Sequence, residues 1–325
     1  MTSENTPLVS ILIRSMDRPT LDRAIASAVT QTWPNVEIVV VAACGSAHRA
    51  LPTPQNGRDV RLIVPNPDRN LPRPEAANLA LESARGEWLN FLDDDDELLP
   101  AHVETLMNAR DDARVVYSRA MVRDKSGETT GFCGVPSLLS RFRYDTPTVP
   151  NAMMFHRSLV DEGARFDPAF TIYEDHDFFI NLAARAPMRF VDEATCVWNA
   201  HDGESGLGHG PNNGVSRRGE LSERVRTKWS AQFDAWDSTP GSLMFAGQAL
   251  LKNGDIAAAH DCLERALRQT PNDVNALNLC GMANLHSGNI ERAEQLVSAA
   301  LQRAPANTAL RDNLALIRER RAKTT

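Results

Sequence analysis

Two stretches near the C-terminus repeat one another with a shift of 34 residues. Gly254-Asp255-Ile256 recurs as Gly288-Asn289-Ile290, and the same shift relates further small, apolar and proline positions. These pairs are Gly247/Gly281, Ala259/Ala293, Leu263/Val297, Ala266/Ala300, Leu267/Leu301 and Pro271/Pro305. Each unit predicts two amphipathic helices around a turn, with small residues where the helices approach closely and a proline that closes the second helix. Repeats of this length bury a core only by stacking on one another, so this part of the chain is expected to form a helical array.

The repeat resembles the tetratricopeptide repeat, although leucines hold positions that are usually aromatic: Leu243, Leu250 and Leu263. A third helix, predicted from Thr308 to Arg320, would cap the apolar end of the stack. We therefore expect a small all-α domain over residues 240–325. Its surface is expected to serve a protein partner or self-association.

Upstream of the repeat, short apolar runs alternate with helical patterns. The runs predict strands at Leu8–Ile13, Val36–Val41, Val60–Val64 and Trp88–Leu92, and the patterns between them predict helices at Thr20–Gln31 and Ala76–Arg85. A hairpin is expected where Val115–Val122 and Thr129–Phe132 flank Lys125-Ser126-Gly127. Strands that alternate with helices predict an α/β domain with a mostly parallel sheet and a ligand site at the carboxyl ends of the strands. We assign residues 1–235 to this domain.

Composition excludes several classes of protein. The formal net charge of -7 comes without a lysine- and arginine-rich stripe, which argues against nucleic acid as a partner. The five cysteines are scattered and form no C-x-x-C pair, so a reducing compartment is expected. No apolar stretch approaches the ~20 residues of a membrane span, and no secretion signal is visible. We expect a cytoplasmic protein, whose contact with a membrane, if any, is peripheral and at the inner face.

The sharpest local signal is the run Phe91-Leu92-Asp93-Asp94-Asp95-Asp96, which follows a predicted strand directly. Adjacent carboxylates repel one another, so the run is costly unless solvent, a helix N-terminus or a cation relieves it. Oxygen-only ligands at this density suit Mg²⁺ or Mn²⁺. The alternative is that the run caps a helix beginning near Leu98, with Asp96 at its N-terminus.

Several segments together resemble the family 2 glycosyltransferases. The matching segments are VSILIRSMDRPTLDRAIASAVTQTWPNVEIVVV, RPEAANLALESARGEWLNFLDDDDELLP, RFDPAF and YEDHDFF, in the order in which that family has them. The resemblance implies a GT-A fold, in which helices flank a Rossmann-like, mostly parallel mixed sheet. It also implies that a hexosyl or N-acetylhexosaminyl group moves from a nucleotide-sugar donor to a hydroxyl, with inversion. The acceptor would be a saccharide, a lipid-linked molecule or a protein.

The same resemblance implies roles for individual residues. Asp93 and Asp95 would form the ends of the D-x-D motif and, with His201, bind Mn²⁺ or Mg²⁺; His209 is a weaker alternative to His201. Asp175 would be the catalytic base, although it equally suits the N-terminus of a helix. The residues implied in donor binding are Arg14, Ser15, Asp17, Arg73, Asn78, Asp93 and Asp94.

One departure from the family leaves the donor base open. The family's second strand usually leads into an aspartate that reads uracil, but here the chain continues Val41-Ala42-Ala43-Cys44. A degenerate transferase that acts as a scaffold through its helical repeats is therefore the alternative function. A nucleotidyltransferase ranks below both, because Ile13–Arg18 contains no glycine-rich phosphate loop. Trp198 is expected to pack in the core, and the glycine-rich residues 203–214 are expected to order over the donor as a lid.

Overall fold

The computed structural model describes residues 6–51, 57–136, 139–143, 146–200, 215–236, 239–252 and 254–324. These residues form two compact units, each described here by itself. The first unit combines residues 1–137 with 146–229, and the second combines residues 138–145 with 230–325. The residues 203–214 for which a lid was expected, and His201 and His209, lie outside the described ranges, and helix α6 begins just after them at Val215.

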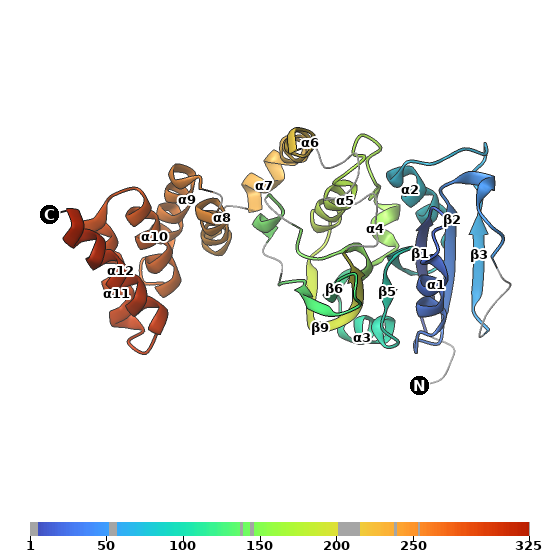
Figure 1. The fold of residues 1–325 in the computed structure, drawn as a ribbon, viewed down its shortest axis with the longest axis horizontal. Helices are drawn as coiled ribbons and strands as arrows, with labels where there is room; N and C mark the ends of the chain where they lie inside the picture. The colour runs from blue at the N-terminus through green and yellow to red at the C-terminus, as the bar shows by residue number, and fades with distance from the viewer. Residues whose placement is uncertain are drawn as a thin grey trace. The chain divides into compact units, whose positions relative to one another are not determined.

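The first unit is built on one mixed sheet, whose strand order is β3-β2-β1-β4-β8-β6-β9-β5 with β7 added beside β6 (Figure 1). Its strands are β1 (Val9–Ser15), β2 (Val36–Ala42), β3 (Asp59–Ile63), β4 (Trp88–Asp93), β5 (Glu97–Leu98), β6 (Val115–Arg123), β7 (Thr129–Cys133), β8 (Met153–His156) and β9 (Met188–Asn199). Its helices are α1 (Leu21–Val29), α2 (Arg73–Ser83), α3 (His102–Ala109), α4 (Ser158–Asp161), α5 (Glu174–Ala183) and α6 (Val215–Lys228). The predicted α/β class and the predicted hairpin, which is β6 and β7, are confirmed.

The pairing of the strands gathers many carboxyl ends at one edge of the sheet. Strands β1 to β4 are mutually parallel. Strand β8 runs antiparallel to both β4 and β6, and β9 runs parallel to β6. Strands β1, β2, β3, β4, β6 and β9 therefore end at the same edge, where α/β proteins bind their ligands.

The two faces of the sheet bury different side chains. Along β1, Val9, Ile11 and Ile13 pack with apolar residues of α1 and α3. Side chains alternate along a strand, so Arg14 belongs to the opposite face, where α2 and α5 pack. On that face Phe178 of α5 stacks on Phe166, with ring centroids 4.1 Å apart. Helix α5 is thus anchored by aromatic packing beside the strand ends.

The acidic run does not begin a helix. Glu97–Leu98 is the short strand β5, which pairs antiparallel with β9, and helix α3 starts only at His102. Asp96 accepts a hydrogen bond from the backbone N–H of Asn199, at the end of β9, at 2.8 Å. The helix-cap alternative for Asp96 is therefore wrong. Instead, the run carries the chain from the end of β4 to the end of β9.

The second unit confirms the predicted helical repeats. It contains α7 (Ser230–Trp236), α8 (Pro240–Lys252), α9 (Ile256–Gln269), α10 (Val274–His286), α11 (Ile290–Arg303) and α12 (Thr308–Thr324), drawn from orange to red in Figure 1. The predicted turns separate the helix pairs, and the side chains of Asp255 and Asn289 cap α9 and α11. A Cβ added at Gly247 would clash with Leu263 of the next helix, which explains why this position is a glycine.

A segment from the middle of the chain also belongs to the second unit. The short 3-10 helix η3 (Leu139–Arg143) follows β7 in sequence, and its Phe142 is fully buried. The Phe142 ring lies 6.0 Å from that of Trp236, and Arg143 pairs with Asp234 at 2.8 Å. The unit boundary therefore falls at residues 229 and 230, so that α7 groups with the repeats instead of with residues 1–235.

Among the described residues, no helix combines the length and the hydrophobicity that crossing a membrane requires.

We predict that Gly247→Ala destabilises the helical unit. The added methyl group must displace the buried Leu263 side chain, which should cost about 1–3 kcal/mol in the free energy of unfolding. Gly241→Ala in the same helix is the matched control, because a Cβ there meets no described atom within 4 Å. Urea unfolding followed by helical circular dichroism measures both variants. Equal stabilities would contradict the close approach of α8 and α9.

A second prediction concerns His102, a fully buried residue whose Nδ1 lies 2.7 Å from Thr195 Oγ1. Burial lowers its pKa to about 3. Because the pKa is lower in the folded chain than in the unfolded chain, stability is complete above pH 6.5 and is lost as the pH falls towards 3. Between pH 7.5 and pH 5.5 this histidine should lower the free energy of unfolding by about 1.4 kcal/mol. In the His102→Gln variant, the free energy of unfolding measured with urea should lack this part of the pH dependence. If its pH dependence equals that of the wild type, His102 is not the cause.

Candidate active site

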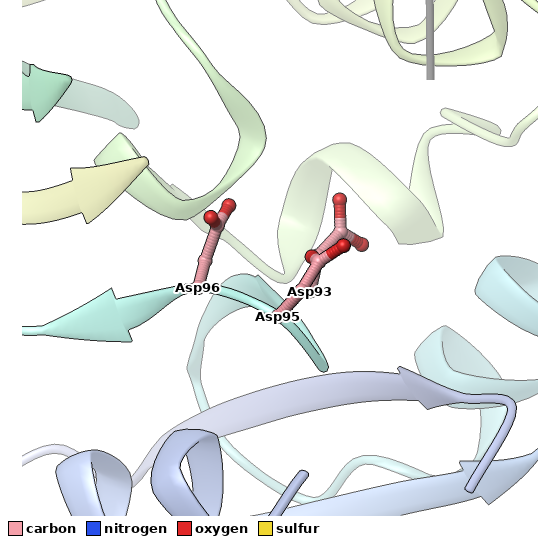
Figure 2. Close-up of side chains that lie close together, drawn as sticks. All are labelled: Asp93, Asp95 and Asp96. Carbon is pink, nitrogen blue, oxygen red and sulfur yellow. The ribbon is translucent and has the colours of Figure 1, made fainter. Parts of the chain in front are cut away.

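The acidic run lies at the carboxyl edge of the sheet. Asp93, Asp95 and Asp96 each offer a carboxylate oxygen within 4.8 Å of those of the other two. Figure 2 shows the three side chains projecting to the same side from the end of β4 and the segment after it. Asp95 and Asp96 are buried, whereas Asp93 is partly exposed. The geometry thus unites the predicted ligands Asp93 and Asp95 and adds Asp96 to them.

The charges of the run are unevenly balanced. Burial, followed by the charge of Asp93, raises the pKa of Asp95 to about 6. Burial and the charges of Asp95 and Asp93 hold the pKa of Asp96 well above its usual range. Burial acts in the same direction on Asp93, but the guanidiniums of Arg14 and Arg73 outweigh it and lower the pKa of that carboxyl. Asp95 and Asp96 therefore form a buried acidic pair that is short of positive charge.

Arg18 holds the middle of the run. Its Nη1 donates to Asp94 Oδ1 at 2.9 Å and to Asp95 Oδ2 at 2.8 Å. Asp94 Oδ2 also accepts from the backbone N–H of Met16 at 2.9 Å. The turn after β1 is thereby bound to the acidic run, as its predicted role beside the nucleotide requires.

Arg14 connects the run to helix α5. Its Nη2 donates to Asp93 Oδ1 at 2.6 Å, and its Nη1 donates to Glu174 Oε1 at 3.2 Å. Burial opposes the charge of Arg14, but the carboxylates of Asp93 and Glu174 raise its pKa overall. Arg73, at the start of α2, is a second partner of Glu174 at 3.4 Å. Two of the predicted donor-binding arginines thus meet at one buried glutamate.

Asp175 occupies the first turn of α5. Its Oδ1 accepts from the backbone N–H of His176 at 2.8 Å, and the side chain is only partly buried. Its charge reaches Arg14 and Glu174, since it raises the pKa of both. Asp175 therefore belongs to the same cluster of charges as the acidic run, and it keeps solvent access.

The remaining residues of the nucleotide-facing turn form a separate network at the ends of β1 and β2. Ser15 Oγ lies 2.8 Å from His48 Nε2 and accepts from the backbone N–H of Asp17 at 2.9 Å. Asp17 has a left-handed backbone, with φ of 61°. Its Oδ2 accepts from the backbone N–H of Arg49 at 2.8 Å, and its Oδ1 accepts from the Arg49 side chain at 2.6 Å. A carboxylate therefore stands close to the strand end where Ala42 and Ala43 supply none.

Asn78 forms hydrogen bonds within the protein, and Trp198 lies at the surface. The Asn78 amide donates to the carbonyl of Phe166 at 2.9 Å and accepts from its N–H at 3.0 Å, so it links α2 to the segment before α5. Trp198 is 38% exposed, so the expectation that it packs in the core is wrong. It stands next to Asn199, which ends β9 beside Asp96.

Three residues that sequence reasoning did not assign to the site are Arg18, Glu174 and Asn199. Each follows a predicted residue or precedes it closely, but their contacts cross from one element to another. Asn199 Nδ2, for example, donates to the carbonyl of Asp95 at 2.8 Å. In the sequence, only their positions indicated that they belong to the site, since Arg18 adjoins Asp17 and Glu174 adjoins Asp175.

The donor set of the run fits a divalent cation. Its carboxylate oxygens are the ligands that Mg²⁺ and Mn²⁺ prefer. The raised pKa of Asp95 and of Asp96 reflects buried negative charge that a cation would relieve.

Comparison with known proteins confirms the resemblance. Residues 10–155 match the model of glycosyl transferase family 2, and residues 246–308 match that of the tetratricopeptide repeat. The chain is 26% identical over 202 residues to the uncharacterized glycosyltransferase YwdF of Bacillus subtilis (strain 168), which covers 60% of this chain and 75% of that protein. It is 24% identical over 219 residues to the putative colanic acid biosynthesis glycosyl transferase WcaA of Escherichia coli (strain K12), covering 64% and 78%.

Among solved structures, the chain resembles that of S. aureus TarS 1–349 in complex with UDP-GlcNAc. The TM-score is 0.50 at 14% identity, and the match covers 98% of this chain and 92% of that one. At this identity the likeness concerns the fold alone, and it agrees with the GT-A architecture.

Proposed function

We propose that this chain is an inverting, metal-dependent enzyme of glycosyl transferase family 2, the family whose model matches residues 10–155. It moves a hexosyl or N-acetylhexosaminyl group from a nucleotide sugar to an acceptor hydroxyl. The observation that carries the proposal is the meeting of the buried acidic run with the first turn of α5 through Arg14. The acceptor we favour is a growing saccharide, because the relative WcaA is named for colanic acid biosynthesis.

Asp93, Asp95 and Asp96 would hold Mn²⁺ or Mg²⁺ against the donor diphosphate. The sequence also predicts His201 as a ligand, and this residue lies outside the described ranges. A bound divalent cation would neutralise the charge that builds on the diphosphate as the glycosidic bond breaks. Arg18 and Arg73 stand beside the run and add fixed positive charge near the same leaving group.

Asp175 would act as the catalytic base. Its carboxylate would accept the proton of the acceptor hydroxyl while that oxygen attacks the anomeric carbon. Attack from the side opposite the diphosphate inverts the configuration. The partial exposure of Asp175 supports this role, because an acceptor has to reach the base from solvent.

The nucleotide base is the least constrained part of the donor. Ala42 and Ala43 are buried and carry no group that could read a base. Asp17, 20% exposed and bound to Arg49, is a carboxylate in the turn after β1, whose last residue, Ser15, pairs with Ala42. A panel of UDP-, GDP- and dTDP-linked sugars with Mn²⁺ tests the proposal, and the absence of turnover with every donor would favour the scaffold alternative.

We predict that Asp175→Asn abolishes transfer while donor binding is retained. Asparagine keeps the size of the side chain and its capacity to accept from His176, but it cannot take a proton at neutral pH. A loss of about 100-fold or more in kcat is expected, with the Kd of UDP changed less than threefold. Asp161→Asn, an exposed change of the same kind on α4, is the control. A full rate in Asp175→Asn would remove this residue from the role of base.

We also predict that Asp95→Asn weakens binding of UDP that depends on Mn²⁺ by about tenfold or more, because one charged ligand is lost. Calorimetry with and without EDTA separates this effect from metal-independent binding. Asp161→Asn should bind as the wild type does. If EDTA leaves the UDP affinity of the wild type unchanged, the metal-dependent reading of the run fails.

A further inference from the structure

Both edges of the Arg14 guanidinium are occupied within the protein. Nε and Nη2 donate to Asp93 Oδ1, at 3.2 and 2.6 Å, and Nη1 donates to Glu174 Oε1 at 3.2 Å. The Arg14 side chain is 8% exposed and that of Glu174 is 2% exposed. A guanidinium buried in this way is badly placed to bind the donor directly. Its contacts suit a connection between two parts of the protein.

One end of the connection is the N-terminus of α5, where Glu174 also pairs with Arg73 at 3.4 Å. Tyr173, just before α5, has a left-handed backbone with φ of 63°, and its own side chain makes no capping hydrogen bond to the helix. Its first turn carries Glu174, Asp175 and Asp177. Asp177 is bound from the other side by Lys228 and Trp229, at 2.8 and 2.7 Å. The sheet side of the same turn is bound through Glu174.

We propose that Arg14 is a positioning residue for Asp175: by joining Asp93 to Glu174, it holds the helix that carries the base at a fixed separation from the acidic run. This inference rests on the proposed role of Asp175 as base. Small errors in such a separation are costly, since a displacement of about 1 Å at a reacting centre can lower a rate about 100-fold. Arg14 would thus act on the rate of transfer through Asp175, without touching the acceptor.

The planar fork of arginine is what allows one side chain to contact both carboxylates. A lysine has a single ammonium on a flexible stem and does not reproduce a two-ended contact. Arg14→Lys therefore keeps the buried positive charge and weakens the connection. It is a better test than Arg14→Met, which removes the positive charge beside the buried carboxylate of Glu174 and the partly buried one of Asp93 and so threatens folding itself.

The experiment compares Arg14→Lys, Glu174→Gln and the double variant with the wild type. Arg85→Met is the control, because Arg85 is 64% exposed and its ion pair with Asp59 spans 3.7 Å. Three quantities are measured: kcat with the donor that turns over, the Kd of UDP with Mn²⁺, and amide hydrogen exchange along α5. Each single variant should lose about 10- to 100-fold in kcat, with the Kd changed less than threefold.

Exchange should become faster in the first turn of α5, including the Asp177 N–H bonded to the Tyr173 carbonyl, and stay unchanged in α1 and α3. The double variant should be no slower than the worse single variant, because both changes break one connection. A kcat loss that matches a loss of UDP affinity, or unchanged exchange in α5, would overturn the proposal. If the wild type turns over no donor, the proposed function fails, and the exchange data alone still decide whether Arg14 holds α5.

Discussion

Buried negative charge at the end of β4 is the constraint to which the site is adapted. Asp93 to Asp96 follow one another, and Glu174 is buried beside them. Removing carboxylates from water is expensive unless positive charge accompanies them. The fold supplies arginines from three places: the end of β1, the turn that follows it, and the start of α2. The arginines do not balance all of the negative charge at Asp95 and Asp96. This imbalance distinguishes the run from a network of salt bridges and favours a cation there.

Sheet topology explains why these charges meet. Strands β1 and β4 are parallel, so their carboxyl ends lie at the same edge of the sheet. Because β8 runs antiparallel to both β4 and β6, the carboxyl ends of β6 and β9 lie at that edge as well. Strand β5 then pairs with β9, so the acidic run has to cross between the two halves of the sheet. The alternation of side chains along β1 directs Arg14 towards α5, whereas its apolar neighbours pack against α1. Residues that are 160 positions apart, Arg14 and Glu174, become partners as a result.

Periodicity predicted the elements well where burial dictates the pattern. The first four strands and both intervening helices agree with prediction to within a few residues, and the repeat period predicted the turns at Gly254 and Gly288 that separate α8 from α9 and α10 from α11. Prediction failed where a contact depends on a distant partner. Glu97–Leu98 is too short to carry a pattern and exists as a strand only because β9 lies beside it. Likewise, Trp198 is an apolar residue in a strand, a pattern that predicts burial. It is exposed because it lies at the end of β9, next to the last residue of the strand. The role proposed for Asp175 came from family resemblance, since residue type alone fits a helix terminus equally well, whereas the density of carboxylates directly after a strand already indicated a cation at the acidic run.

The membership of η3 in the helical unit makes the boundary between the units discontinuous along the chain. The polypeptide leaves the first unit after β7, returns before β8, and departs again at residue 229. The helical repeats are therefore not an appendage that a single cut could detach. Phe142 lies in an insertion between two strands of the sheet and is buried against the helices of the second unit. Deleting everything after residue 229 would leave this side chain without the helices that bury it. Any replacement of the repeats therefore has to retain a surface that buries Phe142, even though this residue lies almost 90 positions before the unit boundary at residues 229 and 230.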